Sequence, residues 1–546
     1  MNAEVTTNSV TANDVTANDV TANTIDATVV TNRAIGRNTT LGGRIWHGIH
    51  NRKWPIAMTV AVITTGMAFS LLFDPLVNND VWHFSKQFLL KNPHIAYRLH
   101  HGLIPHQWAW ATPGDIWGTL ESSRMIGWGS LGSIYTAHGG FLLPPGLLIM
   151  LLPVDFAVRI FHLSVSFPFS VPRPTAWLVL GPYEMAMSGF ALFGLDALAE
   201  HLGIPQRRRA WLCVAEALAL WQVVVIWGHP EDVVALGFGA YAIRALLNKR
   251  RVAAGWLLGA ALATQTFTVL LIPVILAADI SRTSLARNTA ANTASRGTAG
   301  VTVPSTMTAP TPSAVTSPGV SSMPHTIWAY TKQVLPILWR AIAVPAVLVA
   351  TPLIAQPKAT WRALVIQPTY PKVDQPTPWL ALAPKLAHGA VSGGVPRILT
   401  LLAACLIGIL AYRMALRRDI QSTVILACAF SLFSWPFFES VMVSYYLWPA
   451  LAFALLAAGM SGSWRIAGTL IVGMFSMLYA FFQPRGQFGM EWQYWIVVIG
   501  SLGIALIFTI PRWILWWILW WVLPRWGGDR EGGRYGERRK KEEGSI

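Results

Sequence analysis

The stretch RRRAWLCVAEALALWQVVVIWGHPEDVVALGFGAYAIRALLNKRR, residues 207–251, decides the fold. Its two apolar runs, 210–227 and 231–247, meet at the turn Gly228-His229-Pro230-Glu231-Asp232, and a basic cluster bounds each outer end. Apolar runs of roughly 18 residues cross the ~30 Å hydrocarbon core of a bilayer as α-helices. Short loops rich in Lys and Arg stay on the cytoplasmic side. The stretch therefore predicts a transmembrane helical hairpin whose turn, residues 228–232, faces outward.

The composition of the whole chain agrees with this prediction. Of 546 residues, 53% are hydrophobic and only 12% are charged. Soluble globular proteins carry about twice that share of charge, roughly 25%. This excludes a soluble multidomain enzyme, a disordered chain and a disulfide-built scaffold. The net charge of +16 lies mainly in basic clusters between apolar runs, which favours membrane topology over nucleic-acid binding.

Further apolar runs predict an all-α, polytopic transmembrane helix bundle of about 11–13 spans, some broken or re-entrant, with extracytoplasmic loops. The run at 252–279 is interrupted by Thr264-Gln265-Thr266, which predicts two half-length helices that enter and leave on the same side. The run at 141–163 is expected not to cross fully, because the basic clusters require an even number of crossings before residue 207. The runs are at 54–73, 141–163, 175–199, 210–227, 231–247, 252–279, 334–356, 397–412, 422–438, 441–459, 464–482 and 493–510.

Two low-complexity stretches divide the chain. Residues 10–23 repeat the phrase VTAND, and the stretch near 281–325 is rich in Ser, Thr, Ala and Pro. Such sequence has little apolar surface to bury. The predicted organisation is a disordered cytoplasmic tail (1–53), a transmembrane module (54–280) with a long outer loop (74–139), a flexible linker (281–325), a C-terminal transmembrane region (326–526) and a charged tail (527–546).

Residues that can carry chemistry gather in the predicted outer segments. Asp74 and Asp80 follow the first span, where a half-shielded carboxylate can act as a general base, and the simpler interpretation is a capped, solvated loop. His229, Glu231 and Asp232 form the outer turn, which is either a binding site or a solvated hairpin end. Other candidates are Tyr135 and His138 before Pro144-Pro145, Tyr370 and Trp379 in a Pro-rich outer loop, and Glu439 and Tyr445 between two later spans.

Other classes of site have little support. The sequence shows no Walker loop, no nucleotide fingerprint and no catalytic Ser-His-Asp pattern. Cys213, Cys405 and Cys428 lie inside apolar runs. No cofactor is expected with certainty. A divalent metal on His229, Glu231 and Asp232 stays an open alternative, because one His with two adjacent acids is a weak metal signal.

The order of these motifs resembles the C-type glycosyltransferases, in particular the actinobacterial mannosyltransferase-like group that uses polyprenyl-phosphate mannose. The resemblance covers roughly residues 54–280. One feature departs from it, because many relatives carry a Lys where this chain has Thr264-Gln265-Thr266. The matching features are Asp80 after the first span, Tyr135 before Pro144-Pro145, the Gly228–Asp232 turn, Arg250 with Ala254-Gly255 and Gly259, and more weakly Tyr445 to Pro449.

The resemblance implies a multi-pass plasma-membrane enzyme with a cytoplasmic N-terminus. It would move a sugar, with mannose expected, from a polyprenyl-phosphate donor to a cell-envelope glycolipid or glycan, with Asp80 as catalytic base. Arg98, Arg124 or His138 would balance the charge of the leaving phosphate. Two alternatives stay open, namely a transporter or flippase of a lipid-linked saccharide and a non-catalytic partner of an envelope-building complex. The expected substrate-binding residues are Asp74, His83, Arg98, Arg124, Tyr135, His138, His229, Glu231, Asp232, Tyr370, Trp379, Glu439 and Tyr445.

Overall fold

The computed structural model separates a unit formed by Met1–Lys53 from a unit formed by Trp54–Ile546, and the fold concerns the second. Its regular structure is helical apart from two short antiparallel strands, β1 (Lys385–Leu386) and β2 (Gly389–Ala390), in the described residues. The all-α prediction is therefore confirmed. The structure describes residues 51–72, 110–136, 143–166, 171, 173–298, 323–366, 375–386, 389–390, 393–417, 419–482 and 490–510.

Eight helical segments in the described part of the chain are long and apolar enough to cross a membrane. They belong to α3 (Lys53–Leu72), α9 (Trp177–Ala186) with α10 (Ser188–His201), η2 (Thr266–Leu270) with α14 (Leu271–Thr298), α15 (Met323–Ala355), α17 (Val395–Ala415), α18 (Ile420–Phe438), η6 (Ser444–Leu447) with α19 (Trp448–Ser461), and α20 (Ser463–Phe482). The helices α11 (Gln206–Val225), α12 (Pro230–Leu247), α13 (Arg251–Thr264) and α21 (Glu491–Ile507) complete the bundle. The chain is a multi-pass helical membrane protein.

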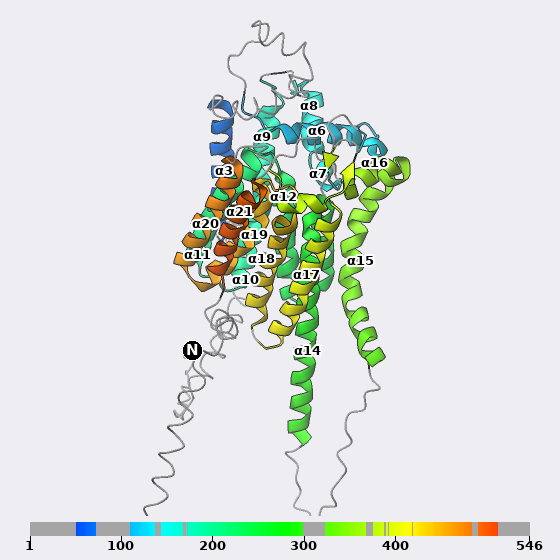
Figure 1. Cartoon of the computed structure of the whole chain (residues 1–546), viewed down its shortest axis with the longest axis vertical. Helices are drawn as coiled ribbons and strands as arrows, with labels where there is room; N and C mark the ends of the chain where they lie inside the picture. The colour runs from blue at the N-terminus through cyan, green and yellow to red at the C-terminus, as the bar shows by residue number, and fades with distance from the viewer. Residues whose placement is uncertain are drawn as a thin grey trace, which may run out of the picture. The chain divides into compact units, whose positions relative to one another are not determined.

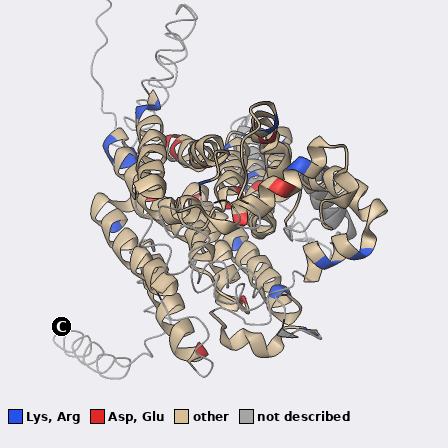
Figure 2. Ribbon diagram, turned by 90° about the horizontal axis from the view of Figure 1, so that it is seen from above, with Lys and Arg blue, Asp and Glu red and all other residues tan. Residues whose placement is uncertain are grey.

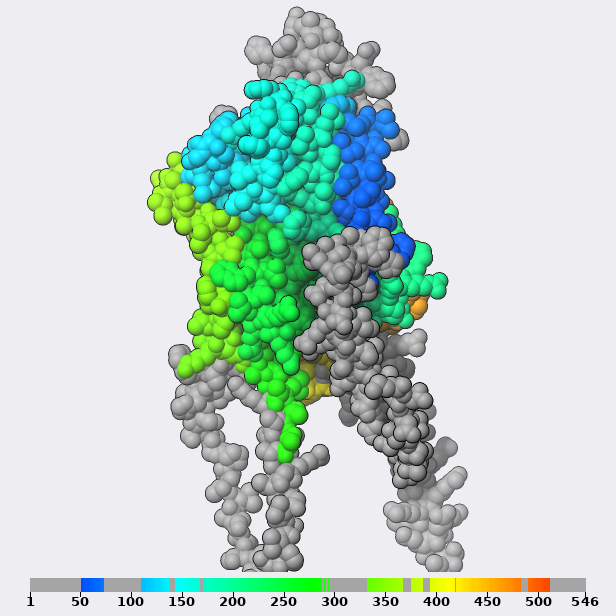
Figure 3. All heavy atoms as spheres, turned by 180° about the vertical axis from the view of Figure 1, so that it is seen from behind, coloured from blue at the N-terminus to red at the C-terminus, as the bar shows by residue number. Residues whose placement is uncertain are grey.

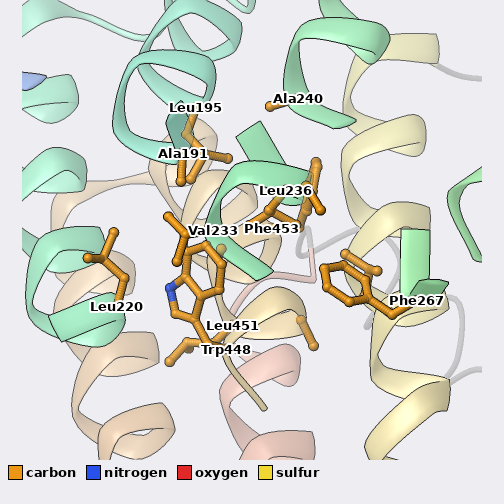
Figure 4. Packing of buried hydrophobic residues seen from close by; sticks show 14 of the residues in the cluster. Ala191, Leu195, Leu220, Val233, Leu236, Ala240, Phe267, Trp448, Leu451 and Phe453 are labelled. Atoms are coloured by element: carbon orange, nitrogen blue, oxygen red, sulfur yellow. The ribbon is translucent and has the colours of Figure 1, made fainter. Parts of the chain in front are cut away.

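Burial differs sharply between the helices. Within the span at Ser444–Ser461, 83% of residues are buried, against 17% in the α15 span and 28% in α17. Large apolar side chains on α15 face outward, such as Val347 and Ile354, which are 71% and 83% exposed. Such faces are stable against lipid. Figure 4 shows the opposite environment, where Trp448 and Phe453 of α19 pack among Leu220, Val233 and Leu236.

The close packing of α13 against α15 depends on small residues. A Cβ added at Gly255 would lie 3.0 Å from the carbonyl oxygen of Ile337, and one at Gly259 would lie 2.7 Å from that of Arg340. Membrane helices often approach at such Gly-x-x-x-Gly spacing, because packing and not hydrophobic exclusion drives their association. The half-helix predicted from Ala254-Gly255 and Gly259 is thus a packing element.

The run at 252–279 is broken at Gln265, as predicted, but its second arm is not half-length, because η2 with α14 is long enough to cross a membrane. The chain becomes extended at Gln265 (φ −151°), between α13 and η2. Arg251 Nε, at the start of α13, donates to Asp279 Oδ1 at 2.6 Å, so the second arm returns to the end where the first began. We call this the basic end of the bundle. One boundary needs correction, because α14 continues through residues 281–298, where the linker was expected.

The helix α14 continues because its second half is rich in Ala, with Leu and Arg, which are good helix formers. The residues around Asp279 also anchor the start of the predicted linker, since Arg282 Nη1 donates to the carbonyl oxygens of Leu246 and Leu247, both at 2.6 Å. Within the linker range, α15 already begins at Met323, and residues 299–322 lie outside the described part of the chain.

The segment at 141–163 does not cross, as expected. It contains α7 (Gly146–Met150) and α8 (Leu152–Ile160), and neither has the length of a span. With α6 (Gly114–Gly127), these short helices lie over the opposite end of the bundle from the basic end (Figures 1 and 3). Shorter elements are η1 (Leu131–Ser133), α16 (Pro357–Trp361), the π-helical turn η4 (Arg362–Ile366) and η5 (Pro378–Leu382).

Candidate functional site

The turn between α11 and α12 is held tightly in place. Gly228 has φ +68°, and a Cβ added there would lie 2.6 Å from Cβ of Pro113, just before α6. Pro230 then opens α12, and Glu231 and Asp232 lie in its first turn, where the helix dipole favours negative charge. Both acids are buried, at 2% and 0% exposure. The turn is therefore not a solvated hairpin end. In Figure 2, acidic positions likewise appear among the helices.

His229 joins three elements. Its Nδ1 lies 2.5 Å from Glu231 Oε1, its Nε2 lies 3.1 Å from Asp115 Oδ2 of α6, and its ring stacks on Tyr445 at 3.9 Å between centroids. Burial disfavours the imidazolium, but the carboxylates of Glu231 and Asp115 outweigh it, so the pKa of His229 is raised well above its ordinary value. The carboxylate oxygens at both ring nitrogens favour the protonated ring, so His229 is the centre of a short network with Glu231 and Asp115.

Two more carboxylates lie beside this network. Asp232 Oδ1 accepts a hydrogen bond from Gln265 Nε2 at 2.7 Å, at the break between α13 and η2. Glu184 of α9 is fully buried, and its Oε1 would lie 3.4 Å from a Cβ on Gly228. Neither oxygen of Glu184, nor Oδ2 of Asp232, has a hydrogen-bond partner in the described part of the chain. We call Asp115, Glu184, His229, Glu231 and Asp232 the carboxylate cluster.

A row of aromatic rings extends from the carboxylate cluster. Tyr445 contacts Tyr446 at 4.7 Å between centroids, Tyr446 contacts Trp435 at 4.4 Å, and Trp435 stacks on Phe267 at 5.1 Å. Glu439 borders this row, because its Oε2 accepts from Trp435 Nε1 at 3.2 Å. The site thus combines carboxylate oxygens with aromatic faces at the end of the bundle opposite the basic clusters.

The structure brings together part of the predicted site. His229, Glu231, Asp232 and Tyr445 meet in or against the carboxylate cluster. Glu439 lies farther along the aromatic row, and Trp379 packs nearby against Phe437, Phe438 and Trp495 of α18 and α21. The candidates that lie outside the described residues are Asp74, Asp80, His83, Arg98, His138 and Tyr370.

Two other candidates lie elsewhere. The Tyr135 hydroxyl donates to the carbonyl oxygen of Leu143 at 2.9 Å, and its ring belongs to a small separate apolar cluster with Ile134 and Leu148. Arg124, near the far end of α6, lies with its Nε 3.4 Å from Asp155 Oδ1. Neither residue contributes to the carboxylate cluster.

Some members of the cluster were not among the predicted site residues. Glu184 is one of them, and it is fully buried on α9. Gln265, which bonds to the cluster through Asp232, lies in the predicted break. Asp115 gave no local signal, since it lies 114 positions from its partner His229.

The metal alternative finds no support in the described residues. They contain no group of three or more His, Cys, Asp or Glu arranged to hold a metal ion. Both ring nitrogens of His229 already face carboxylate oxygens.

No protein-family model matches the chain, and no curated protein sequence matches it. The architecture and the site define it as a multi-pass helical membrane protein with a buried, acid-rich cluster at one end of the bundle.

Proposed function

We propose that the chain is a membrane glycosyltransferase of the C type, and the carboxylate cluster carries this proposal. Glu184 and Asp232 offer three buried carboxylate oxygens without hydrogen-bond partners in the described residues. Buried polar atoms in native proteins nearly always have partners. A ligand rich in hydroxyl groups supplies such donors, and the aromatic row from Tyr445 to Phe267 lies beside the carboxylate cluster as an apolar neighbour. A sugar fits both features.

The reaction follows from the sequence resemblance. Asp80 takes the proton from an acceptor hydroxyl as that oxygen attacks the anomeric carbon. The bond from the anomeric carbon to the phosphate oxygen breaks, and polyprenyl phosphate leaves with the electron pair. Because phosphate is already a fair leaving group, positioning and proton removal are the main tasks of the protein. Mannose is the expected sugar, a cell-envelope glycolipid or glycan the acceptor, and the outer face of the plasma membrane the place.

Gln265 determines where the cation for the leaving phosphate is sought in this proposal. Relatives in the family that the sequence resembles often carry Lys in this region, where it can meet a phosphate. Gln265 Nε2 instead donates to Asp232 Oδ1 at 2.7 Å, and a neutral amide cannot make the charge-assisted contact of a Lys. The cation for the leaving phosphate must therefore come from elsewhere, and Arg98, Arg124 and His138 of the first outer loop are the candidates.

A second function has one observation in its favour. Toward the basic end, Arg209 pairs with Asp196 at 2.7 Å, and buried Glu216 lies on the same helix as Arg209. Buried charge in this half of the bundle, together with the broken segment at Gln265, suits a transporter or flippase of a lipid-linked saccharide. A transferase whose site lies only at the opposite end does not require buried charge in this half of the bundle.

The decisive experiment compares Asp80→Asn with Asp74→Asn. Membranes that contain the full chain are given polyprenyl-phosphate mannose and envelope acceptor lipids, and sugar transfer is measured. Asp80→Asn should insert normally and lose about 10²- to 10⁴-fold in rate, the usual contribution of a general base. Asp74→Asn should be much milder if Asp74 only caps the turn. Full activity in Asp80→Asn, or no transfer by wild type while the lipid-linked saccharide moves across vesicles, would replace the transferase with the transporter.

A further inference from the structure

A cavity of about 120 Å³ lies along α6, beyond the carboxylate cluster. Glu121 and Arg124 supply its charged groups. They lie 6 and 9 positions beyond Asp115 on the same helix, which corresponds to about 9 and 13 Å along the axis. The cavity is lined by Trp117, Leu120, Glu121, Arg124, Trp128 and Val165.

Two of the residues that line the cavity, Glu121 and Arg124, each have a buried polar atom without a hydrogen bond. Glu121 Oε2 and Arg124 Nε are both buried and have no hydrogen-bond partner in the described part of the chain. Arg124 Nε lies 3.4 Å from Asp155 Oδ1, but that oxygen accepts from Arg159 Nε at 3.1 Å. A carboxylate residue and a guanidinium residue on one cavity suit a ligand that both donates and accepts hydrogen bonds. A hydroxyl group does both.

The charge around the cavity favours a neutral ligand. The two cations, Arg124 and Arg159, are matched by two acids, Glu121 and Asp155. Arg159 is already engaged, because it pairs with Asp155 and its Nη2 donates to the carbonyl oxygen of Arg124 at 3.1 Å. A phosphate would bring uncompensated negative charge to this balanced group, whereas a neutral polyol would not.

The aromatic residues complete the cavity. Trp128 is 59% exposed, and the guanidinium carbons of Arg124 and Arg159 each lie 5.4 Å from the centre of its ring. These two cation–π contacts hold the largely exposed Trp128 ring at the rim of the cavity. Trp117 lies opposite in the core, with its Nε1 donating to Thr112 Oγ1 at 3.1 Å. The indoles are thus fixed before any ligand arrives.

We propose that this cavity binds one saccharide unit of a neutral glycan. The inference rests on the proposed function, in which the cavity is a subsite for the acceptor chain and α6 connects it to the carboxylate cluster. It assigns Arg124 to the acceptor and leaves the phosphate to Arg98 or His138. Glu121 accepts from a sugar hydroxyl, and Arg124 donates to a sugar oxygen.

The test measures binding of α-linked mannotriose to the purified full chain by saturation-transfer difference NMR. Glu121→Gln and Arg124→Gln should each weaken binding about tenfold, because each replaces a charge-assisted hydrogen bond with a weaker neutral one. Val165→Phe, which fills the cavity, should abolish binding. Thr119→Ala is the matched control on α6, because Thr119 does not line the cavity, and it should bind like wild type. Phosphocholine at the same concentration should not compete.

The results separate this inference from the proposed function. No mannotriose binding by wild type, or equal binding by all variants, overturns the subsite. Competition by phosphocholine overturns it in favour of a lipid headgroup site. Sugar transfer by wild type without these binding effects leaves the transferase intact and removes only the subsite. Binding with these effects but without transfer keeps the subsite and removes the transferase.

Discussion

The two ends of the bundle treat buried charge in opposite ways. At the basic end, Asp279 accepts from Arg251 and from Gln333, and Thr283 accepts from both of these residues. At the other end, Glu184 is fully buried with no hydrogen-bond partner in the described residues, and Asp232 has a partner on one oxygen only. A charge that loses its partner in a protein interior is strongly destabilising. The contacts of Asp279 therefore stabilise the fold, whereas the unpartnered oxygens of the carboxylate cluster suit a ligand.

One helix connects the two regions. Asp232 lies in the first turn of α12, and the carbonyl oxygens of Leu246 and Leu247 at its other end accept from Arg282. Most of α12 is buried between these points. A change in the position of α12 should therefore disturb both ends, whereas a change in one network should leave the other intact.

The largest effect is expected from Gly237→Ala, in the middle of α12. A Cβ at Gly237 would lie 2.3 Å from the carbonyl oxygen of Phe190, at α10, and backbone cannot yield as a side chain can. We expect a loss of about 3 kcal/mol or more, the upper range for overpacking, and little folded protein. Gly500→Ala on α21 is the control, because no atom lies within 4 Å of the added Cβ. Size-exclusion profiles and melting temperatures in detergent would be measured, and equal melting of the two variants would contradict this packing.

A smaller and more local effect is expected from Asp279→Ala. It leaves Arg251 and Gln333 without their acceptor, and we expect a loss of about 2–3 kcal/mol, below the usual range for a buried pair because Arg251 is 40% exposed. Asp232→Asn is the matched change at the other end. It keeps an oxygen for Gln265 and removes one charge from a crowded group, so its melting temperature should not fall. A lower melting temperature for Asp232→Asn than for Asp279→Ala would reverse the comparison.

The sequence predicted what depends on local pattern. Hydropathy predicted the eight long apolar helices of the described residues, although α11 and α12 of the predicted hairpin are not among those eight. Thr264-Gln265-Thr266 predicted the break, because the length of apolar runs and their interruptions set these features directly. The predicted start of the linker at residue 281 was wrong. Low hydropathy suggested a flexible chain there, but helix-forming residues and the contacts of Arg282 extend α14 beyond this point.

The site depended on long-range contacts that no local pattern encodes. The turn at 228–232 stood out because its acids interrupt apolar runs. Asp115 and Glu184 complete the carboxylate cluster only through folding, since each is a single acid in an ordinary context. Tyr135, predicted from its place before Pro144-Pro145, lies away from the carboxylate cluster, and its hydroxyl donates to the carbonyl oxygen of Leu143 in a separate apolar cluster.

The smallest change in melting temperature is expected from the titration of His229 with pH. Its pKa is raised in the folded protein by Glu231 and Asp115, against the effect of burial, so folding favours the protonated ring. The resulting stability is fully present below the ordinary pKa of about 6.5 and is lost as pH rises through the higher folded pKa. Glu184 and Asp232 are the other acids that face this region.

The measurement compares the melting temperatures of wild type and His229→Gln in detergent between pH 6 and pH 9.5. Wild type should melt above the variant at pH 6, and the gap should narrow as pH rises. Ser440→Ala is the control, because Ser440 is uncharged and bonds to Glu439 beside the aromatic row. The difference between its melting temperature and that of wild type should stay constant across the pH range. A gap that widens with pH would mean that His229 is neutral in the folded state. The carboxylate cluster would then carry still more uncompensated negative charge, and the contrast between the two ends of the bundle would be sharper.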